Sequence, residues 1–199
     1  MRPERGSQAH TSSLGASDRR RDAGRKDAGH LEDRRPQIVR ERPGKGYRHV
    51  LRRRDVETFL SILPDGDELM AGLDRVVLAA GDPELHGWYQ TGSIAICAWS
   101  RELRQAMTHA NYQRDRAVLE ELGVPIERRA HDVLVHFDEA TIRGFQLMEV
   151  FLHELGHHRD RVTTRSRVWC ARGEPFAERY AVEYGERVWA RYREAFGQP

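Results

Sequence analysis

The chain is poor in cysteine, in lysine and in long apolar runs. Its two cysteines, Cys97 and Cys170, show no CxxC spacing, so neither a disulfide framework nor a thiolate zinc site is indicated, and both are interpreted as plain small side chains. No run approaches the roughly 18 apolar residues that span a bilayer, and the N-terminus lacks the apolar core of a signal peptide. We therefore expect no membrane partner and a cytoplasmic location.

The first 46 residues are also poor in apolar side chains. Only four of them are Val, Ile, Leu or Phe: Leu14, Leu31, Ile38 and Val39. So little apolar surface cannot offset the entropy of ordering the segment, which predicts a disordered tail over 1–46 and one folded domain over 47–199.

The tail is basic, because residues 1–45 hold ten Arg and two Lys against seven acids, a net charge of +5. Binding of the tail to nucleic acid or to an acidic partner is one interpretation. A solvated tail is the favoured one, since the acids are interspersed among the arginines. Arginine outnumbers lysine throughout the chain, 31 to 2, which most simply reflects a GC-rich genome and weakens any argument from arginine content to nucleic acid.

Apolar periodicity over the rest of the chain predicts an α+β domain with a short mixed sheet. Strands are expected at 75–80, 93–99 and 132–137, and helices at 55–63, 100–122, 145–159 and 173–196. The stretch HGWYQTG at 86–92 is interpreted as a turn-rich connection. The strand at 132–137 precedes the helix at 145–159, so its open edge could pair with an extended peptide.

The stretch that carries chemistry is HELGH, inside the apolar run FQLMEVFLHELGHH. Residues four apart lie on one face of an α-helix, so His153 and His157 can bind the same divalent cation. Zinc suits imidazole and carboxylate ligands and leaves a position for water, from which Glu154 can take a proton as a general base. His158 points about 100° away from His157 and is not expected to be a ligand.

The third ligand is expected in the first turn of the last helix. Glu174 lies about 50° from the centre of that helix's apolar stripe, and Glu178 about 90° from it. A carboxylate near a buried face needs a partner, so Glu174 is predicted to bind the metal. Glu178 is then placed to accept the free ring N–H of His153. The opposite assignment, with Glu178 on the metal, stays open.

HELGH followed by a helix that reads EPFAERYA, Glu174 to Ala181, resembles the gluzincin zinc metalloproteases. The likeness is to compact, single-domain (minigluzincin-like) members, including bacterial peptidases that cleave repressor proteins, and it covers about residues 145–181. In that clan a carboxylate after HExxH binds zinc and an acid one turn later supports a histidine. The resemblance implies a small zincin-like domain in which His153, His157 and Glu174 hold Zn²⁺ and Glu154 is the base.

These features predict a zinc-dependent peptidase that hydrolyses peptide bonds of a protein or peptide substrate. A further donor to the oxyanion is expected from Tyr180, His136 or an arginine of 159–172. Three alternatives stay open: a zinc-stabilised regulatory protein without catalysis, a nucleic-acid-associated regulator acting through the tail, and a metal-dependent hydrolase of other substrates. Three further histidines are interpreted as surface or structural residues: His86, His109 and His131.

Overall fold

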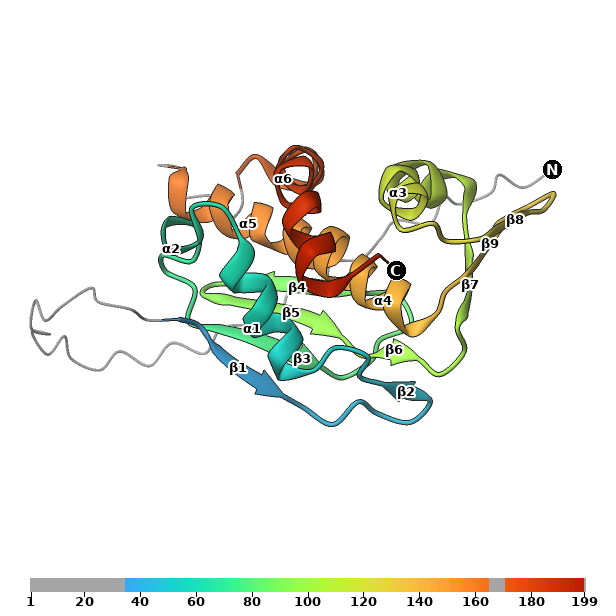
Figure 1. The fold of residues 1–199 in the computed structure, drawn as a ribbon, viewed down its shortest axis with the longest axis horizontal. Coiled ribbons are helices and arrows are strands. Elements are labelled where there is room, and N and C mark those ends of the chain that lie inside the picture. Colours follow the sequence, from blue (N-terminus) through green and yellow to red (C-terminus); the bar gives the residue numbers. More distant parts are fainter. Residues whose placement is uncertain (1–34, 165–170, 199) are drawn as a thin grey trace, which may run out of the picture. The chain divides into compact units, whose positions relative to one another are not determined.

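The computed structural model of the protein describes residues 35–164 and 171–198, which belong to one structural unit. The predicted disorder of residues 1–34 lies outside these residues, and so do Arg165, Arg167 and Cys170. Where the chain is described, it is a mixture of α-helices and short strands, as predicted (Figure 1). Among the described helices, none has the length and apolarity that a bilayer crossing requires.

A four-stranded mixed sheet forms one side of the core. Its order is β1-β3-β5-β4, with β1, β3 and β5 parallel and β4 antiparallel at one edge. The strands are β1 (Gln37–Arg40), β3 (Arg75–Ala79), β4 (Gly87–Gln90) and β5 (Ser93–Cys97). The mixed sheet and its two predicted strands are thereby confirmed.

Two predictions about this sheet are wrong. Disorder was expected up to residue 46, but β1 pairs along its whole length with β3, so backbone pairing orders a segment that has few apolar side chains. The folded part therefore begins before residue 47. The stretch at 86–92 is mostly strand, because β4 pairs with β5 and leaves only Thr91 and Gly92 between them. Gly92, at φ 71°, supplies the left-handed turn.

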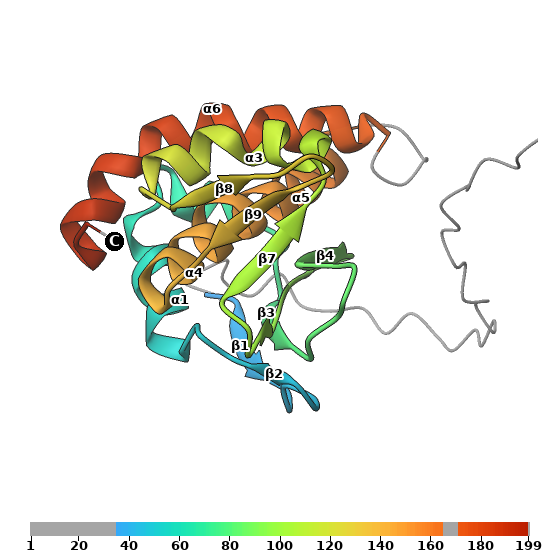
Figure 2. The ribbon, with the colours of Figure 1, turned by 90° about the vertical axis from the view of Figure 1, so that its right-hand side faces the viewer.

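Helices cover one face of this sheet. They are α1 (Arg53–Ile62), the short α2 (Gly66–Leu69), a continuous run of α4 (Glu139–Phe145), the π-helix η1 (Gln146–Phe151) and α5 (Leu152–Thr163), and α6 (Gly173–Phe196). The helices predicted at 55–63, 145–159 and 173–196 are confirmed in place. Figure 2 shows α6 lying along α5 on the side away from the sheet.

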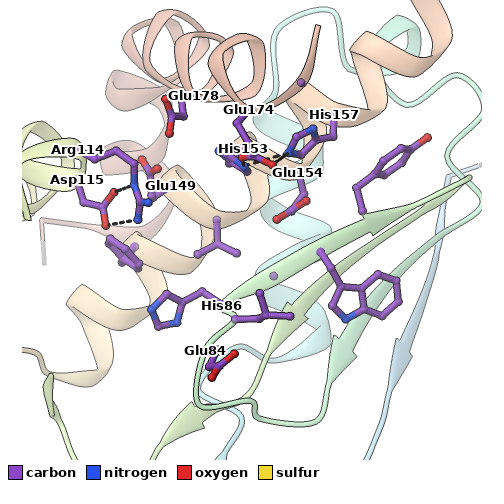
Figure 3. Close-up of a pocket in the computed structure, with 17 residues that line it drawn as sticks. Glu84, His86, Arg114, Asp115, Glu149, His153, Glu154, His157, Glu174 and Glu178 are labelled. Atoms are coloured by element: carbon purple, nitrogen blue, oxygen red, sulfur yellow. Dashed lines mark hydrogen bonds and ion pairs between the residues drawn. The ribbon is translucent and has the colours of Figure 1, made fainter. Parts of the chain in front are cut away.

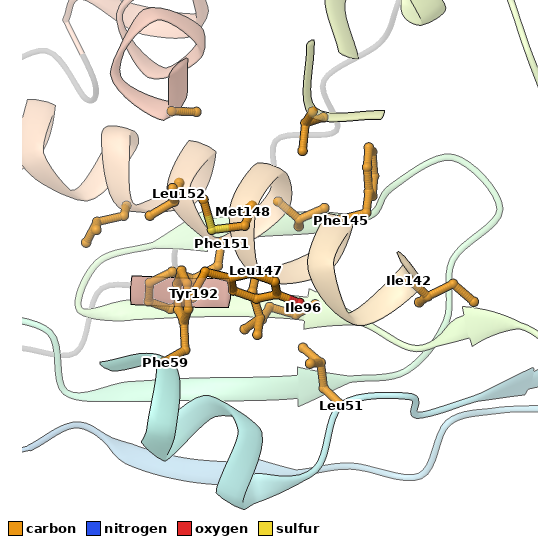
Figure 4. Packing of buried hydrophobic residues seen from close by; sticks show 14 of the residues in the cluster. Leu51, Phe59, Ile96, Ile142, Phe145, Leu147, Met148, Phe151, Leu152 and Tyr192 are labelled. Carbon is orange, nitrogen blue, oxygen red and sulfur yellow. The ribbon is translucent and has the colours of Figure 1, made fainter. Parts of the chain in front are cut away.

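The main core lies between the sheet and these helices. Alternate residues of the two central strands contribute to it: Val76 and Leu78 of β3, Ile94 and Ile96 of β5. Phe59 of α1 meets Phe151 of η1 edge to face, with ring centroids 5.6 Å apart, and it meets Tyr192 of α6 at 6.4 Å (Figure 4). One core thus fixes α1, η1 and α6 over the sheet.

The helix predicted at 100–122 is wrong in its first half. The chain there forms β6 (Trp99–Ser100), which pairs with β2 (Tyr47–Arg48), then β7 (Arg104–Met107) and α3 (His109–Glu121). Leu103 and Met107 are four residues apart, a spacing that puts side chains on one face of a helix and also on one face of a strand. Pairing of β7 with the later strand β9 (Val133–His136) decides between them.

The predicted strand at 132–137 is confirmed as β9 (Val133–His136). It is the middle strand of a three-stranded antiparallel sheet, between β7 and β8 (Ile126–Arg128). Both of its edges are therefore paired, and the expectation that it offers an open edge to a peptide is wrong.

Candidate metal centre

The HELGH motif lies in the first turns of α5, directly after the π-helix. The run begins at Asp138, whose Oδ1 accepts a hydrogen bond from the N–H of Thr141 at 2.7 Å and so caps α4. Within η1, the buried side chain of Gln146 donates to the carbonyl of Cys97 in β5 at 2.8 Å. Single π turns inside α-helices are frequent at functional sites. Here the π turn is bound to the sheet just before the two histidines.

The three predicted ligands meet between α5 and α6 (Figure 3). The Nε2 atoms of His153 and His157 are 3.2 Å apart. Glu174, in the first turn of α6, places one carboxylate oxygen 3.1 Å from Nε2 of His153 and the other 3.3 Å from Nε2 of His157. The side chains of the histidines are 20% and 12% exposed and that of Glu174 is 70% exposed, so the group opens towards solvent on one side.

These separations fit a tetrahedral zinc ion. Zn–N and Zn–O distances near 2.0–2.1 Å put neighbouring ligand atoms roughly 3.3 to 3.4 Å apart, close to the distances found here. Burial lowers the pKa of His153, and His157 lowers it further, while Glu174 and Glu178 act in the opposite direction. The net effect favours neutral imidazole, which is the form that binds a metal. Two imidazoles and one carboxylate are a donor set that zinc prefers.

Glu154 is buried beside this group and lines the same pocket. Burial raises the pKa of its carboxyl to about 8, and the charge of Glu174 adds to the effect. Its side chain runs along β4, because a Cβ placed on Gly87 would come within 3.3 Å of Cγ of Glu154. A side chain larger than hydrogen at Gly87 would also meet Val150 and the carbonyl of Ala95, so β4 and the motif helix are in direct contact.

A pocket of about 610 Å³ opens beside the three ligands (Figure 3). That volume lies within the range of sites that bind small molecules or parts of a peptide. Its walls come from the segment that leads into and forms β4, from α3, from η1 and α5, and from the first turns of α6. Acids outnumber basic residues in this lining: Glu84, Asp115, Glu149, Glu154, Glu174 and Glu178 face a single arginine, Arg114, among the described residues.

The sequence did not point to three further residues that line the pocket: Arg114, Asp115 and Glu149. Arg114 makes two hydrogen bonds to the carboxylate of Asp115, at 2.7 and 3.1 Å. Burial raises the pKa of Glu149 to about 8, Asp115 raises it further and Arg114 lowers it. Glu149 stands four residues before His153, so an acid inside the apolar run was the available signal. Arg114 and Asp115 reach the pocket only through the long-range placement of α3.

His86 also lines the pocket, whereas it was interpreted as surface or structural. Its ring stacks on Trp99 with centroids 5.1 Å apart, and its Nε2 lies 2.9 Å from Nε2 of Gln105. Burial lowers the pKa of His86. The residue therefore has a packing role and also borders the cleft.

His158 is not a ligand, in agreement with its predicted direction. The ring is fully buried, with Nε2 3.1 Å from the carbonyl of Ala71 and Nδ1 3.2 Å from the hydroxyl of Tyr89. Because a carbonyl only accepts, Nε2 carries the proton and Nδ1 accepts from the tyrosine. The histidine after the motif thus joins α5 to β4.

Those predicted oxyanion donors that belong to the described residues do not line the pocket. Tyr180 stacks on Tyr184 with ring centroids 5.5 Å apart, and His136 lies 3.8 Å from Glu127. Among the arginines of 159–172, Arg159 bonds to Glu68 and Arg172 to Asp160. These predictions are therefore not supported for the described residues.

Glu178 lines the pocket one turn after Glu174 but is not in the group formed by His153, His157 and Glu174. Within the described ranges, no hydrogen bond joins Glu178 to His153, so its predicted supporting contact is not formed here.

No protein-family model, curated protein or solved structure matches this chain.

Proposed function

We propose that the protein is a zinc-dependent peptidase with a compact, zincin-like fold. The observation that carries the proposal is the convergence of His153, His157 and Glu174 on one point beside the buried Glu154. The likeness of HELGH and EPFAERYA to the gluzincins supports the same conclusion. His153, His157 and Glu174 would hold the zinc ion, which would supply the Lewis acidity that lowers the pKa of a water molecule and polarises the carbonyl of the substrate.

Glu154 has the environment of a proton shuttle. Its pKa of about 8 without a cation reflects burial, and a cation bound to the neighbouring residues would favour its ionised form. A carboxyl whose pKa is brought near neutrality can take a proton from water and return it to the departing amine. Its contact with β4 places this carboxyl beside the strand that borders the pocket.

The edge strand β4 is the part of the sheet suited to hold an extended substrate. It is the end strand of β1-β3-β5-β4, and it pairs with β5 on one side only within that sheet. Addition of a peptide to an exposed edge satisfies backbone groups of both chains. Pairing with an extended peptide was predicted for residues 132–137, which contain β9. We assign it to β4 instead, because β4 lies against Glu154 and has an unpaired edge within its sheet, whereas both edges of β9 are paired.

The test compares the wild-type protein with Glu154→Gln on a mixture of unfolded proteins, with new chain ends identified by mass spectrometry. We expect zinc-dependent cleavages that disappear in the variant, while both proteins bind one equivalent of zinc. Cleavage should stop with a chelator and return with added zinc.

Identical cleavage by both proteins would contradict the role of Glu154. A wild-type protein that binds zinc but cleaves nothing would instead favour the zinc-stabilised, non-catalytic alternative. A protein that binds no zinc would contradict both the zinc peptidase and the zinc-stabilised, non-catalytic alternative.

A further inference from the structure

The first turn of α6, which presents Glu174, is held from outside the helix. Its N-cap residue, Arg172, makes no capping hydrogen bond with its own side chain. The cap comes from Asp160 of α5, whose Oδ2 accepts the N–H of Arg172 at 2.8 Å and the N–H of Gly173 at 3.1 Å. A carboxylate on these N–H groups complements the positive end of the helix dipole.

The same carboxylate makes a third bond. Oδ1 of Asp160 accepts from Nε of Arg172 at 2.7 Å, and Asp160 is fully buried. Nη2 of Arg172 continues to the hydroxyl of Thr163 at 2.6 Å, and the guanidinium lies over the ring of Phe176, 3.7 Å from its centroid. Asp160 is thus the centre of a small polar network that joins the end of α5 to the start of α6.

The position of this network in the chain links it to the ligands. Asp160 follows His157 by three residues on the same helix, and Gly173 immediately precedes Glu174. The bonds of Asp160 therefore connect the helix that carries two ligands to the backbone that carries the third.

The rest of α6 has other attachments. Gly156 of α5 packs against Ala177, the hydroxyl of Tyr184 donates to the carbonyl of Pro64, and Arg191 donates to the carbonyl of Ile62 at 3.1 Å. These contacts do not involve Asp160. Loss of its carboxylate should consequently release the first turn of α6 while the rest of the helix stays docked.

We propose that Asp160 is a positioning residue for the metal centre, which sets the place of Glu174 by capping α6 from α5. The inference rests on one part of the proposed function, which is that His153, His157 and Glu174 bind a metal. It predicts that metal affinity depends on a residue that is not itself a ligand.

The experiment measures the dissociation constant of zinc by competition with a chromogenic chelator for the wild type, Asp160→Ala and the isosteric Asp160→Asn. We expect a rise of about 10- to 100-fold for the alanine variant, the range found when partners that orient ligands are lost. The asparagine variant, which keeps an acceptor oxygen, should show a smaller rise. It also serves if the alanine variant does not fold.

Asp55→Ala is the matched control. Asp55 is also buried, and it accepts the N–H of Arg52 at 2.8 Å to cap α1, away from the ligands. This variant should lose thermal stability as Asp160→Ala does, but keep the zinc affinity of the wild type. A second readout is the visible spectrum of the cobalt-substituted protein, which should change in both Asp160→Ala and Glu174→Ala and stay unchanged in Asp55→Ala.

Three results would overturn the inference. Wild-type zinc affinity and cobalt spectrum in both Asp160 variants would show that the cap does not place Glu174. An equal loss of affinity in Asp55→Ala would show that general stability governs binding. A wild-type protein that binds no zinc would overturn the proposed function, and the inference about Asp160 with it. Zinc binding by the wild type therefore distinguishes failure of the proposed function from failure of the inference alone.

Discussion

Gly156 and Ala177 pack backbone against backbone where α5 crosses α6. A Cβ added to Gly156 would stand 2.8 Å from Cα of Ala177 and 3.1 Å from its carbonyl oxygen. Cβ atoms do not approach backbone atoms so closely, so the glycine in HELGH sets the distance between the helix with two ligands and the helix with the third. A close helix crossing of this kind needs glycine for space and not for backbone freedom.

Gly156→Ala is therefore expected to destabilise the protein. The overpacking should cost about 1 to 3 kcal/mol, against a gain of about 1 kcal/mol from the better helix propensity of alanine. Gly185→Ala is the matched control, because its Cβ would meet Leu152 and Met148 at 3.8 and 3.9 Å, ordinary contact distances. In urea denaturation with a chelator present, the free energy of unfolding of Gly156→Ala should be lower than that of the wild type. That of Gly185→Ala should be equal to the wild-type value or higher. Equal stability of the two variants would contradict the tight crossing.

Replacement of the two pocket-lining acids of α6, Glu174 and Glu178, tests which of them binds the metal. Glu174→Gln should raise the dissociation constant of zinc by more than the ~10- to 100-fold typical of a lost supporting partner. Glu178→Gln should raise it by no more than that, because Glu178 lies outside the converging group. The measurement is zinc competition, with His157→Ala as the reference for a lost ligand. The reverse order of the two glutamine variants would assign the metal to Glu178.

Glu149 makes stability depend on pH in the metal-free protein. Its folded-state pKa of about 8 lies above the value near 4.3 of an unfolded glutamate, so the folded state holds the proton more tightly. This contribution to stability is complete below pH about 4.3 and is lost as the pH rises through about 8. The side chain in Glu149→Gln cannot ionise, so this variant should not lose stability in this way as the pH rises.

The gain of Glu149→Gln over the wild type should accordingly be larger at pH 8 than at pH 5, by about 1 to 3 kcal/mol after allowance for relaxation. Denaturant unfolding at the two pH values, with a chelator present, measures it. Glu183→Gln, at an exposed position of α6, should show no such difference between the two pH values. A gain for Glu149→Gln that does not change with pH would argue against a buried, protonated glutamate.

The acidic lining of the pocket predicts a preference for basic peptides. Glu84 and Glu178 border the cleft, and Arg114 is engaged by Asp115. Peptides with lysine or arginine beside the cleaved bond should therefore show a kcat/KM about 10-fold higher than matched peptides with glutamate. The difference should shrink as salt rises, since screening weakens the attraction. Faster cleavage of the acidic peptides would refute this charge argument.

The grouping of the candidate ligands could be predicted from the sequence because it depends on local geometry. His153 and His157 share a face because a helix repeats every 3.6 residues, and Glu174 follows from its place in the first turn of an amphipathic helix. The strands at 75–80 and 93–99 followed in the same way from short apolar runs between turn residues.

Features that depend on pairing or packing over long distances could not be predicted. Residues 37–40 are ordered by β3, and residues 104–107 are extended because of β9, although their own side chains leave the choice open. The same holds for Arg114, which reaches the pocket only because α3 is placed there by its sheet. The cap from Asp160 to Gly173 spans 13 residues and has no local pattern.

The π-helix before the motif has a consequence for insertions and deletions. A π turn holds one residue more than an α turn, so η1 changes the phase between the face of α4 and the face of α5. Loss of a single residue from 146–151 would allow a regular α-helix through the whole run and would keep the faces of α4 and α5 in place. Loss of a second residue would rotate α5 by about 100° relative to α4. Either Ile142 or His153 would then leave its present environment. At most one residue can therefore be lost from this six-residue segment before the histidines that follow it turn away from Glu174.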